Sequence, residues 1–582
     1  MLSEEKGNSG FTLRACIIAV LLTIFLLATS SYIALKIGAL PWPIIFSVIV
    51  AGALLKFLSK FMKGTSVHEI NVAQAGGTIG GLLASGVVFT IPGILYLQQQ
   101  GISSVYLPEP WILGAICVVA GILGVLLSVP TRRMFVEEEN LPYPSGTAGA
   151  EVLKAGEKTG KNTYYIAFAL TLTGIFVLFR DLFFPAGLSI PFAPELGLIL
   201  TLYPMPMAIG IGYILGHKAS VNSWFLGSVL GWFVMIPVLA GIYGIDAATG
   251  SGIAKDLGMG FVLGGGIGFF VSYIIPRTKK IFAPMFQWKD SPWFTKYTPL
   301  FSVIAVIVLT LAGIPFLASI ITVAGTWVMV TVAAMMTGET DINPLEQFGI
   351  IIGLLSLGIF AIMSMPLGFL PAFLIVCFVS IATAIAGDIG HDYKSAKIIG
   401  TKAKDIIKVD MLAVIVAGIL APVVLQVIMT AYRSDFFTQA MPAPQAQLVA
   451  GSIFGFANPM IFYAGFLIAF IWILIESITK KKAPVLPMVF GIGLFLGPVL
   501  GILLAIGGII RYYLDKKKAN VYAAGVVIAA GMMGGEGIAG FGAAALFIGG
   551  VPMGTALWSM MILFIPILLI TFYFWKRKGY SG

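Results

Sequence analysis

The chain has 582 residues, of which 59% are hydrophobic and only 10% are charged, and its formal net charge is +10. Soluble domains contain about 25% charged residues, so this composition excludes an ordinary soluble protein. The basic residues are scattered between apolar runs, which indicates membrane orientation rather than a nucleic-acid surface. A backbone in lipid must satisfy its own hydrogen bonds, so we expect an all-α polytopic membrane protein.

Apolar runs recur along the whole chain, and each is long enough to cross a bilayer core of about 30 Å. They predict about sixteen transmembrane helices, and the longer runs with internal Gly or Pro predict re-entrant or broken segments. The first eight runs lie near residues 11–36, 41–61, 71–97, 109–130, 163–180, 196–216, 221–243 and 256–275. The second eight lie near residues 299–337, 346–366, 369–387, 411–430, 450–476, 484–511, 520–549 and 552–575.

The two sets of runs resemble each other. The segment 119–144, which begins VAGILG, is similar to 416–444, which begins VAGILA, and 209–222 is loosely similar to 506–520. Related halves packed around a central site are a common transporter design. The expected domains are therefore two eight-helix halves, residues 1–290 and 291–582.

The distribution of Lys and Arg predicts the orientation in the membrane. Most basic residues fall on one side if both termini are cytoplasmic, as the positive-inside rule requires. The exception is the polar segment 388–410, DIGHDYKSAKIIGTKAKDIIKVD, which this topology places outside or in a re-entrant hairpin.

The segment EEENLPYPSGTAGAEVLKAGE (137–157) is similar to a motif of the oligopeptide transporter (OPT/YSL) family, especially its prokaryotic members. Further resemblances follow in the family's order along nearly the whole chain. They are YIALKIG (32–38), HEINVAQAGGTIGGLLASGVVFTIPGI (68–94), TGETDINP (337–344), AGDIGHDYKSAKIIGTKAKD (386–405), MPAPQA (441–446) and GMMGGEGIAG (531–540). The chain departs from the family at 68–70 and 76–77, where many relatives carry acidic or amide side chains.

The resemblance implies a secondary active transporter of the cytoplasmic membrane, driven by protons, that imports small oligopeptides or peptide-like metal chelates. The partners are then the substrate, protons and the lipid bilayer, with no nucleic acid, no cofactor, no metal site and no enzymatic activity. The absence of a G-x-x-x-x-G-K-[ST] motif from the sequence agrees with a gradient-driven protein. A metal-siderophore importer of the same family is an alternative, and an intramembrane enzyme or a passive channel are alternatives of other classes.

Glu536 is the first candidate for proton coupling or for binding a substrate amine. It lies deep in the apolar run 520–549 with glycines on both sides. An acid at membrane depth usually faces a cavity or a partner, and glycine permits close backbone approach. The alternative is a structural carboxyl that pairs with a Lys of another helix.

Four further candidates lie in two polar segments. Glu339 and Asp341 precede a helix that begins after Pro344, where acids also favour the helix N-terminus simply by capping it. Asp388 is expected to end a span, and His391 follows it in a cluster that is suited to sensing protons. A solvated polar turn is the alternative for this second pair.

A polar stripe is expected on the helix near 71–97, because Asn71, Gln74 and Thr78 recur at helical spacing. These side chains are suited to binding a peptide backbone or a neighbouring helix. Tyr32 and Lys36 end the first span, where reaching out to the membrane interface is the default and contact with a substrate carboxylate is the alternative.

The 137–157 segment itself is expected between the fourth and fifth spans, on the cytoplasmic side. Its prolines predict an extended connector before a short helix, so it is interpreted as a solvated connector or a gate. The residues of this motif are Glu139, Asn140, Pro142, Pro144, Gly146 and Thr147.

Overall fold

The computed structural model describes residues 7–577 apart from 39–46, 49, 53, 56–63, 103–105, 157–160, 185–186, 190–200, 217–218, 275, 277–296, 342, 439, 482 and 516–518. Nearly all of the described chain is helical. It divides into two compact units, and each unit combines segments from both sequence halves. Unit 1 comprises Met1–Thr163, Thr278–Thr430 and Gln445–Ile453, and unit 2 comprises Tyr164–Arg277, Ala431–Pro444 and Phe454–Gly582.

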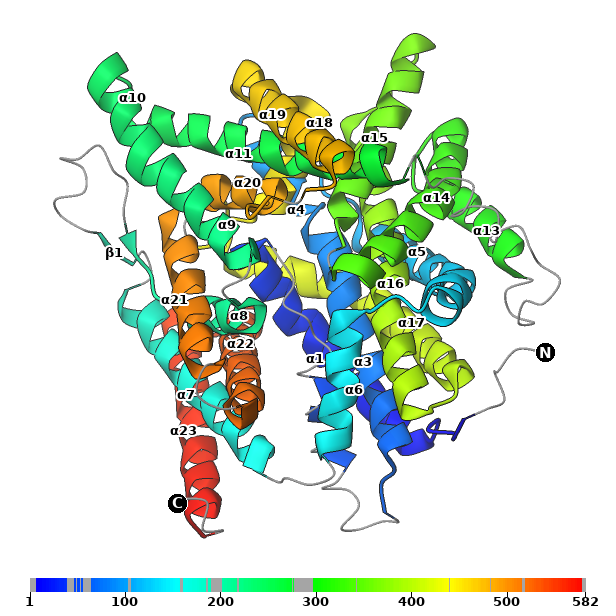
Figure 1. Ribbon diagram of the computed structural model, residues 1–582, viewed down its shortest axis with the longest axis vertical. Coiled ribbons are helices and arrows are strands. Elements are labelled where there is room, and N and C mark those ends of the chain that lie inside the picture. The colour runs from blue at the N-terminus through cyan, green and yellow to red at the C-terminus, as the bar shows by residue number, and fades with distance from the viewer. Residues whose placement is uncertain are drawn as a thin grey trace. The chain divides into compact units, whose positions relative to one another are not determined.

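Unit 1 is built around one long buried helix, α16. The helices α3, α5, α6, α14 and α15 all pack against α16, and α1 packs along α3 (Figure 1). The described elements of unit 1 are α1 (Leu13–Ile37), α3 (Val67–Val88), α4 (Pro92–Gln99), α5 (Pro110–Thr131), the π-helical turn η2 (Arg132–Glu138), α6 (Pro144–Gly156), α13 (Thr298–Leu311), α14 (Phe316–Thr340), α15 (Leu345–Ile362), α16 (Phe369–Ile399), α17 (Ala403–Ala431) and α18 (Pro444–Phe454).

Local sequence explains where these helices start and how closely they approach. Ser66 caps α3 through a capping box with Glu69, whose carboxylate also binds Arg14 of α1 at 2.5 Å. Farther along, a β-carbon at Gly80 of α3 would lie 2.0 Å from the Thr23 carbonyl oxygen of α1. Only glycine permits this helix pair to pack so tightly.

The segment 388–410 corrects one expectation. It forms no extended loop, because α16 continues to Ile399 and α17 begins at Ala403, and the side of the membrane on which the turn between them lies stays a prediction. Several charged side chains of this segment have hydrogen-bond partners inside unit 1. Lys394, for example, donates to the Asn140 side chain at 2.9 Å and to the Leu141 carbonyl at 2.8 Å. A polar segment can therefore continue a buried helix when neighbouring elements supply its hydrogen bonds.

Unit 2 contains two two-residue strands and otherwise helices. The strands pair antiparallel, with Leu188 opposite Leu202. The described elements are α7 (Lys161–Phe183), β1 (Leu188–Ser189), β2 (Thr201–Leu202), α8 (Pro206–Leu215), α9 (Ala219–Ser228), the π-helical turn η4 (Val229–Met235), α10 (Ile236–Tyr243), α11 (Ala247–Phe269), the π-helical turn η5 (Phe270–Ile274), α19 (Pro459–Thr479), α20 (Pro487–Leu496), α21 (Pro498–Asp515), α22 (Ala519–Ile548) and α23 (Met553–Arg577).

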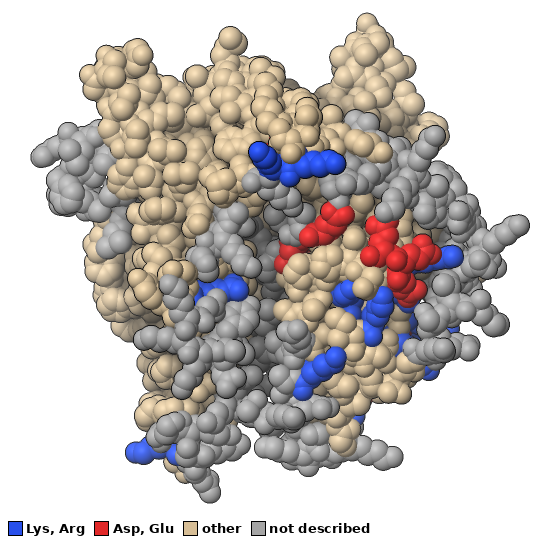
Figure 2. All heavy atoms as spheres, in the orientation of Figure 1, with Lys and Arg blue, Asp and Glu red and all other residues tan. Residues whose placement is uncertain are grey.

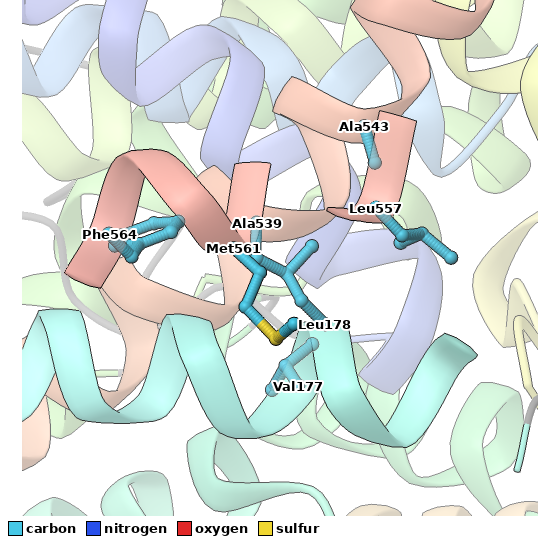
Figure 3. Packing of buried hydrophobic residues seen from close by; sticks show 7 residues of the cluster. All are labelled: Val177, Leu178, Ala539, Ala543, Leu557, Met561 and Phe564. Atoms are coloured by element: carbon cyan, nitrogen blue, oxygen red, sulfur yellow. The ribbon is translucent and has the colours of Figure 1, made fainter. Parts of the chain in front are cut away.

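One apolar core of unit 2 joins α7, α22 and α23. Figure 3 shows its seven buried side chains, with Val177 and Leu178 of α7 lying near Met561 of α23. Gly174 of α7 makes room for the Phe564 ring, because a β-carbon there would lie 2.7 Å from the ring. This core fixes α22 beside α7, which is important for the position of Glu536.

Two short helices of unit 2 resemble each other in sequence and form. The segments PMAIGIGYILG (206–216) and PMVFGIGLFLG (487–497) each begin a ten-residue helix at Pro-Met. Each helix ends at a glycine with positive φ, 75° at Gly216 and 79° at Gly497. The likeness supports two related halves, but the division at residue 290 stays a prediction.

Thirteen of the described helices are long and apolar enough to cross a membrane, and four more are shorter and apolar. The count of sixteen spans is not confirmed, and the expected span 41–61 lies mostly outside the described residues. The single runs expected at 299–337 and 484–511 each contain two helices, α13 with α14 and α20 with α21. In both runs a proline, which cannot donate a backbone hydrogen bond, stands at the break.

The outer surface agrees with a membrane environment. Large apolar side chains are exposed on several helices, for example Leu311 at 80%, Ile362 at 86% and Met460 at 82%. Figure 2 shows a face on which the charged side chains of the described residues form a few small groups among uncharged ones. Such extended apolar surface is unusual for a soluble monomer and is typical of a lipid-facing protein.

Candidate functional site

Three titratable side chains lie on one face of α16, the central helix of unit 1. Asp388, His391 and Asp392 occupy positions i, i+3 and i+4 and so lie on the same side of the helix. His391 and Asp392 are each only 1% exposed. The sequence analysis expected Asp388 and His391 in a polar segment at the end of a span, whereas the structure places them within a buried helix.

The connector before α6 binds this face of α16 at His391. The Gly146 backbone N–H donates to Nδ1 of His391 at 3.2 Å. An imidazole nitrogen that accepts a hydrogen bond carries no hydrogen, so the neutral ring carries its hydrogen on Nε2. That atom lies 3.5 Å from Oδ1 of Asp341. The contact requires glycine at 146, because a β-carbon there would lie 2.3 Å from the His391 carbonyl oxygen.

Asp341 joins the end of α14 to the same connector. It adopts the left-handed conformation, with φ 65°, and caps the C-terminus of α14. Its carboxylate accepts from the Ser145 backbone N–H at 3.0 Å and from the Ser145 hydroxyl at 2.7 Å. Asp341 was expected near a helix N-terminus. It instead ends α14, joins α14 to α6 through Ser145, and lies near His391.

Tyr143 packs against His391 and against α14. Its hydroxyl donates to the Ala334 carbonyl at 2.8 Å, and its ring meets the His391 ring edge-on, with centroids 5.4 Å apart. Burial raises the pKa of Tyr143, and the nearby carboxylates of Asp388 and Glu139 raise it further, so the phenol stays neutral. A β-carbon at Gly390 would lie 2.1 Å from the ring, so α16 has room for Tyr143 only because residue 390 is glycine.

Neutral donors surround the carboxyl of Asp388. Its Oδ1 atom accepts from the Asn343 amide at 3.1 Å and from the Thr337 hydroxyl at 3.3 Å. The Asn343 amide also donates to the Thr383 carbonyl at 3.0 Å, which ties the end of α14 to α16. The hydrogen bonds of Asp388 in the described structure therefore involve no basic side chain.

The polar stripe of α3 binds Asp392. Gln74 donates to Oδ1 of Asp392 at 2.9 Å, and Thr78 donates to Oδ2 at 3.0 Å. Asn71 lies one turn away, where it accepts from Ser395 of α16 at 3.1 Å and donates to Thr401 at 3.0 Å. The stripe expected from sequence therefore binds a neighbouring helix, which was one of the two roles considered for it.

Three other predicted residues lie apart from these hydrogen bonds. Glu339 is an exposed residue near the end of α14. Tyr32 and Lys36 are buried, with Nζ of Lys36 4.9 Å from the centroid of the Tyr32 ring. Lys36 is only 3% exposed, so it does not extend to the protein surface as the default expectation had it. Contact of this pair with a substrate stays a prediction.

The 137–157 motif is a connector, as expected, and α6 (Pro144–Gly156) is the short helix that was expected after it. It is only partly solvated. Glu138 pairs with Arg133 at 3.0 Å on the surface, while Asn140 accepts from both Lys394 and Lys397 of α16. Of the remaining motif residues, Glu139 is partly exposed, Pro142 and Pro144 are exposed, and Thr147 donates to the Pro142 carbonyl at 2.8 Å.

Unit 2 holds the first candidate, Glu536, in a different setting. The Glu536 carboxylate accepts from Arg180 of α7 at 2.9 Å and from the Met207 backbone N–H at 3.1 Å. It is 0% exposed, and Arg180 is 3% exposed. Met207 lies in the first turn of α8, where a carboxylate satisfies an otherwise unpaired N–H and favours the helix dipole. This geometry favours the structural alternative, with Arg in place of the expected Lys, and the coupling role of Glu536 stays a prediction.

Arg180 is itself held by several groups. It donates to Asp181 at 2.7 Å and to the Pro204 carbonyl at 2.8 Å, and it lies 4.2 Å from the centroid of the Tyr203 ring. Burial raises the pKa of Tyr203, and Asp181 raises it further, so the Tyr203 hydroxyl remains a donor to Asp181. The equivalent place at the related helix α20 is different, since Gly265 packs there against Met488, whose Cγ would lie 2.6 Å from a β-carbon at position 265.

Sequence reasoning missed Asp410, Arg180 and Tyr143. Asp410 is the second of two acids in the helix α17, after Asp405 in its first turn, and Arg180 is a single base near the end of α7. An ionisable residue inside an apolar run is a functional or paired site by default, so this signal was present for both. Among the described residues, no group of three or more His, Cys, Asp or Glu is arranged to hold a metal ion.

Comparison with known proteins identifies one family over most of the chain. The family described as OPT oligopeptide transporter protein matches residues 10–275 and 277–547. A Haemophilus influenzae protein described as an oligopeptide transporter is 31% identical over 219 residues, which are 35% of this chain and 32% of that protein. YSL13 of Oryza sativa subsp. japonica, described as a metal-nicotianamine transporter, is 24% identical over 74% of this chain and 68% of its own length. YSL5 of Arabidopsis thaliana, described in the same way, is 27% identical over 39% of this chain and 35% of its own length.

Proposed function

The chain belongs to the OPT oligopeptide transporter family, and from this premise we propose that it is a proton-coupled symporter. It is a multi-pass integral membrane protein, and we place it in the cytoplasmic membrane with both termini in the cytoplasm. Its substrates are small oligopeptides or peptide-like metal chelates, which it imports without a chemical step. The names of the relatives supply these two substrate classes.

The observation that carries the proposal is the setting of Asp392. This carboxyl is buried in the central helix of unit 1, and its described hydrogen bonds come from the neutral side chains of Gln74 and Thr78. A buried carboxyl without a cationic partner can gain or lose a proton without leaving a buried cation unpaired. Carboxyls of this kind serve as proton relays in transporters.

Hydrogen bonds connect Asp392 to other elements of unit 1, so a change in its charge affects their contacts. The hydrogen bonds of Gln74 and Asn71 connect α3 to α16 and to the turn after α16. The connector before α6 binds the same face of α16 one residue earlier, at His391. A proton on Asp392 therefore changes the contacts between α3 and α16 directly, and we propose that this change accompanies substrate passage.

The test is uptake into liposomes that contain the purified protein and an acidic external buffer. Di- to pentapeptides and metal–nicotianamine complexes are supplied separately, each at two external pH values. We expect at least one class to accumulate above its external concentration, and a protonophore to abolish the accumulation. Liposomes without protein are the control.

Two outcomes separate the alternatives. Entry that reaches only the external concentration and ignores the protonophore would indicate a passive channel and overturn the symport proposal. Accumulation of the metal complex alone would assign the chain to chelate import and leave proton coupling intact. Chemical alteration of the substrate during entry would indicate an enzyme.

A further inference from the structure

Asp410 of α17 is a buried acid without any recorded partner. It is 0% exposed, and neither of its carboxylate oxygens accepts a hydrogen bond within the described structure. An ionised carboxylate is unfavourable in such a place, because burial removes its water and no donor or cation replaces that water. A hydrogen or a cation is therefore required at this carboxyl.

Asp410 lies at the same depth as Asp392 in a helical hairpin. Thr401, in the turn between α16 and α17, comes nine residues after Asp392 and nine residues before Asp410. Each residue of an α-helix adds the same rise along the helix axis, so two residues that are equally far in sequence from the turn joining two helices lie at similar heights above that turn. Both carboxyls therefore lie at one level of the hairpin.

Helix α3 confirms this level independently. Its Asn71 binds Thr401 at the turn, and its Gln74 and Thr78 bind Asp392. Gly76 lies between Gln74 and Thr78 on α3 and packs against Val409, the residue before Asp410. A β-carbon at Gly76 would lie 2.7 Å from Cγ2 of Val409.

A third acceptor at this level has no donor. The Gln74 amide nitrogen donates to Asn71 and Asp392, but its Oε1 atom is buried and has no hydrogen-bond partner among the described residues. Two carboxylate oxygens and one amide oxygen are thus left without hydrogens in one region. The arrangement lacks donors rather than acceptors.

The nearby basic side chains are engaged elsewhere. Lys394 and Lys397 bind the connector before α6, and Arg132 lies over the Tyr393 ring, 5.6 Å from its centroid. On α17, Lys408 lies over the Phe11 ring, and Asp405 accepts from Ser9 and Gly10. Neither Asp392 nor Asp410 belongs to an ion pair of the described structure.

We propose that Asp392 and Asp410 form one proton-binding site, in which a buried carboxyl pair shares a single proton and releases it during transport. Two neighbouring carboxylates cannot both remain ionised while they are buried, so one proton stays on the pair until the site opens to water. The inference rests on the proposed proton symport and assigns its proton to named residues.

The first experiment reads the proton directly and needs no substrate. Infrared difference spectra of the purified protein are recorded during a pH titration, with Asp410→Asn and Asp392→Asn beside the wild type. We expect a protonated-carboxyl C=O band in the wild type at neutral pH that is lost or shifted in both variants. Asp405→Asn, the same substitution on the same helix, is the matched control and should leave the band unchanged.

The second experiment measures whether a pH gradient drives substrate accumulation. With about one unit of pH gradient and one proton per substrate, the wild type should accumulate substrate about tenfold. Asp410→Asn should lose that accumulation yet still exchange internal for external substrate within about twofold of the wild-type rate, because exchange needs no net release of the proton. Asp405→Asn should accumulate like the wild type.

Failure of the pair and failure of symport give different results. A wild type that never accumulates substrate, but whose band disappears in both variants, contradicts symport and leaves the pair intact. Unchanged bands and unchanged accumulation in Asp410→Asn overturn the pair. Absence of the band, together with sodium-dependent thermal stabilisation that Asp410→Asn abolishes, also overturns it and assigns a metal cation instead.

Discussion

Two buried acids, Glu536 in unit 2 and Asp392 in unit 1, have opposite electrostatic settings. Glu536 binds Arg180 and the first turn of α8, so its charge is balanced at once by a cation and a helix dipole. Asp392 binds the neutral side chains of Gln74 and Thr78, and no cation pairs with it in the described structure. Burial is the same in both places, so the partners decide which carboxyl is suited to stay charged and which to exchange a proton.

The largest effect expected from this comparison is at Glu536. Glu536→Gln leaves the buried Arg180 without one of its two carboxylates, and breaking a buried pair in this way costs about 3–5 kcal/mol of unfolding free energy. Asp392→Asn should cost less than about 1 kcal/mol, since the Asn oxygen still accepts from Gln74 and Thr78 can donate to the Ala75 carbonyl instead.

Both variants are measured by reversible unfolding in detergent, against the wild type. Equal destabilisation of the two would contradict the distinction between a structural and a proton-exchanging acid. A double variant, Arg180→Met with Glu536→Met, should recover much of the loss at Glu536, because it removes both charges together.

The next effect is expected at the glycine that admits Tyr143. Gly390→Ala places a methyl group 2.1 Å from the Tyr143 ring, so the ring and the connector must move. Overpacking of this kind costs about 1–3 kcal/mol. The measurement is thermal unfolding in detergent, with transport assayed in parallel.

Gly358→Ala is the matched control, since a β-carbon at that exposed position of α15 meets nothing within 4 Å. It should leave stability unchanged or raise it by up to about 1 kcal/mol, because alanine favours helix over glycine. If the two glycine variants behaved alike, the tight packing of Tyr143 on α16 would be disproved.

A smaller effect than that of Gly390→Ala is expected at Ser145. Ser145→Ala removes the 2.7 Å hydroxyl hydrogen bond to Asp341 but keeps the backbone hydrogen bond, so it should cost about 1 kcal/mol. Ser251→Ala, whose exposed hydroxyl donates only within its own helix, is the control and should cost less than about 0.5 kcal/mol. A Ser145 variant as stable as this control would show that the connector does not depend on Asp341.

Much of the architecture could be predicted from the sequence, because apolar length and helix-breaking residues are local properties. The connector at 137–143, the short helix after it and the stripe of Asn71, Gln74 and Thr78 were all predicted in this way. The segment 388–410 continues α16 and α17 instead of forming an extended loop, because elements distant in sequence donate to or accept from side chains such as Asp392 and Lys394. Arg180 and Glu536 lie 356 residues apart, so no local pattern could pair them.

The central claim is that substrate movement carries protons. It is tested most directly by a pH-sensitive dye trapped inside liposomes that contain the protein, with substrate added outside and no initial pH gradient. The account predicts that substrate addition acidifies the interior in the wild type and in Asp405→Asn, and does not do so in Asp392→Asn or Asp410→Asn. Substrate entry into wild-type liposomes without any change of internal pH would contradict it.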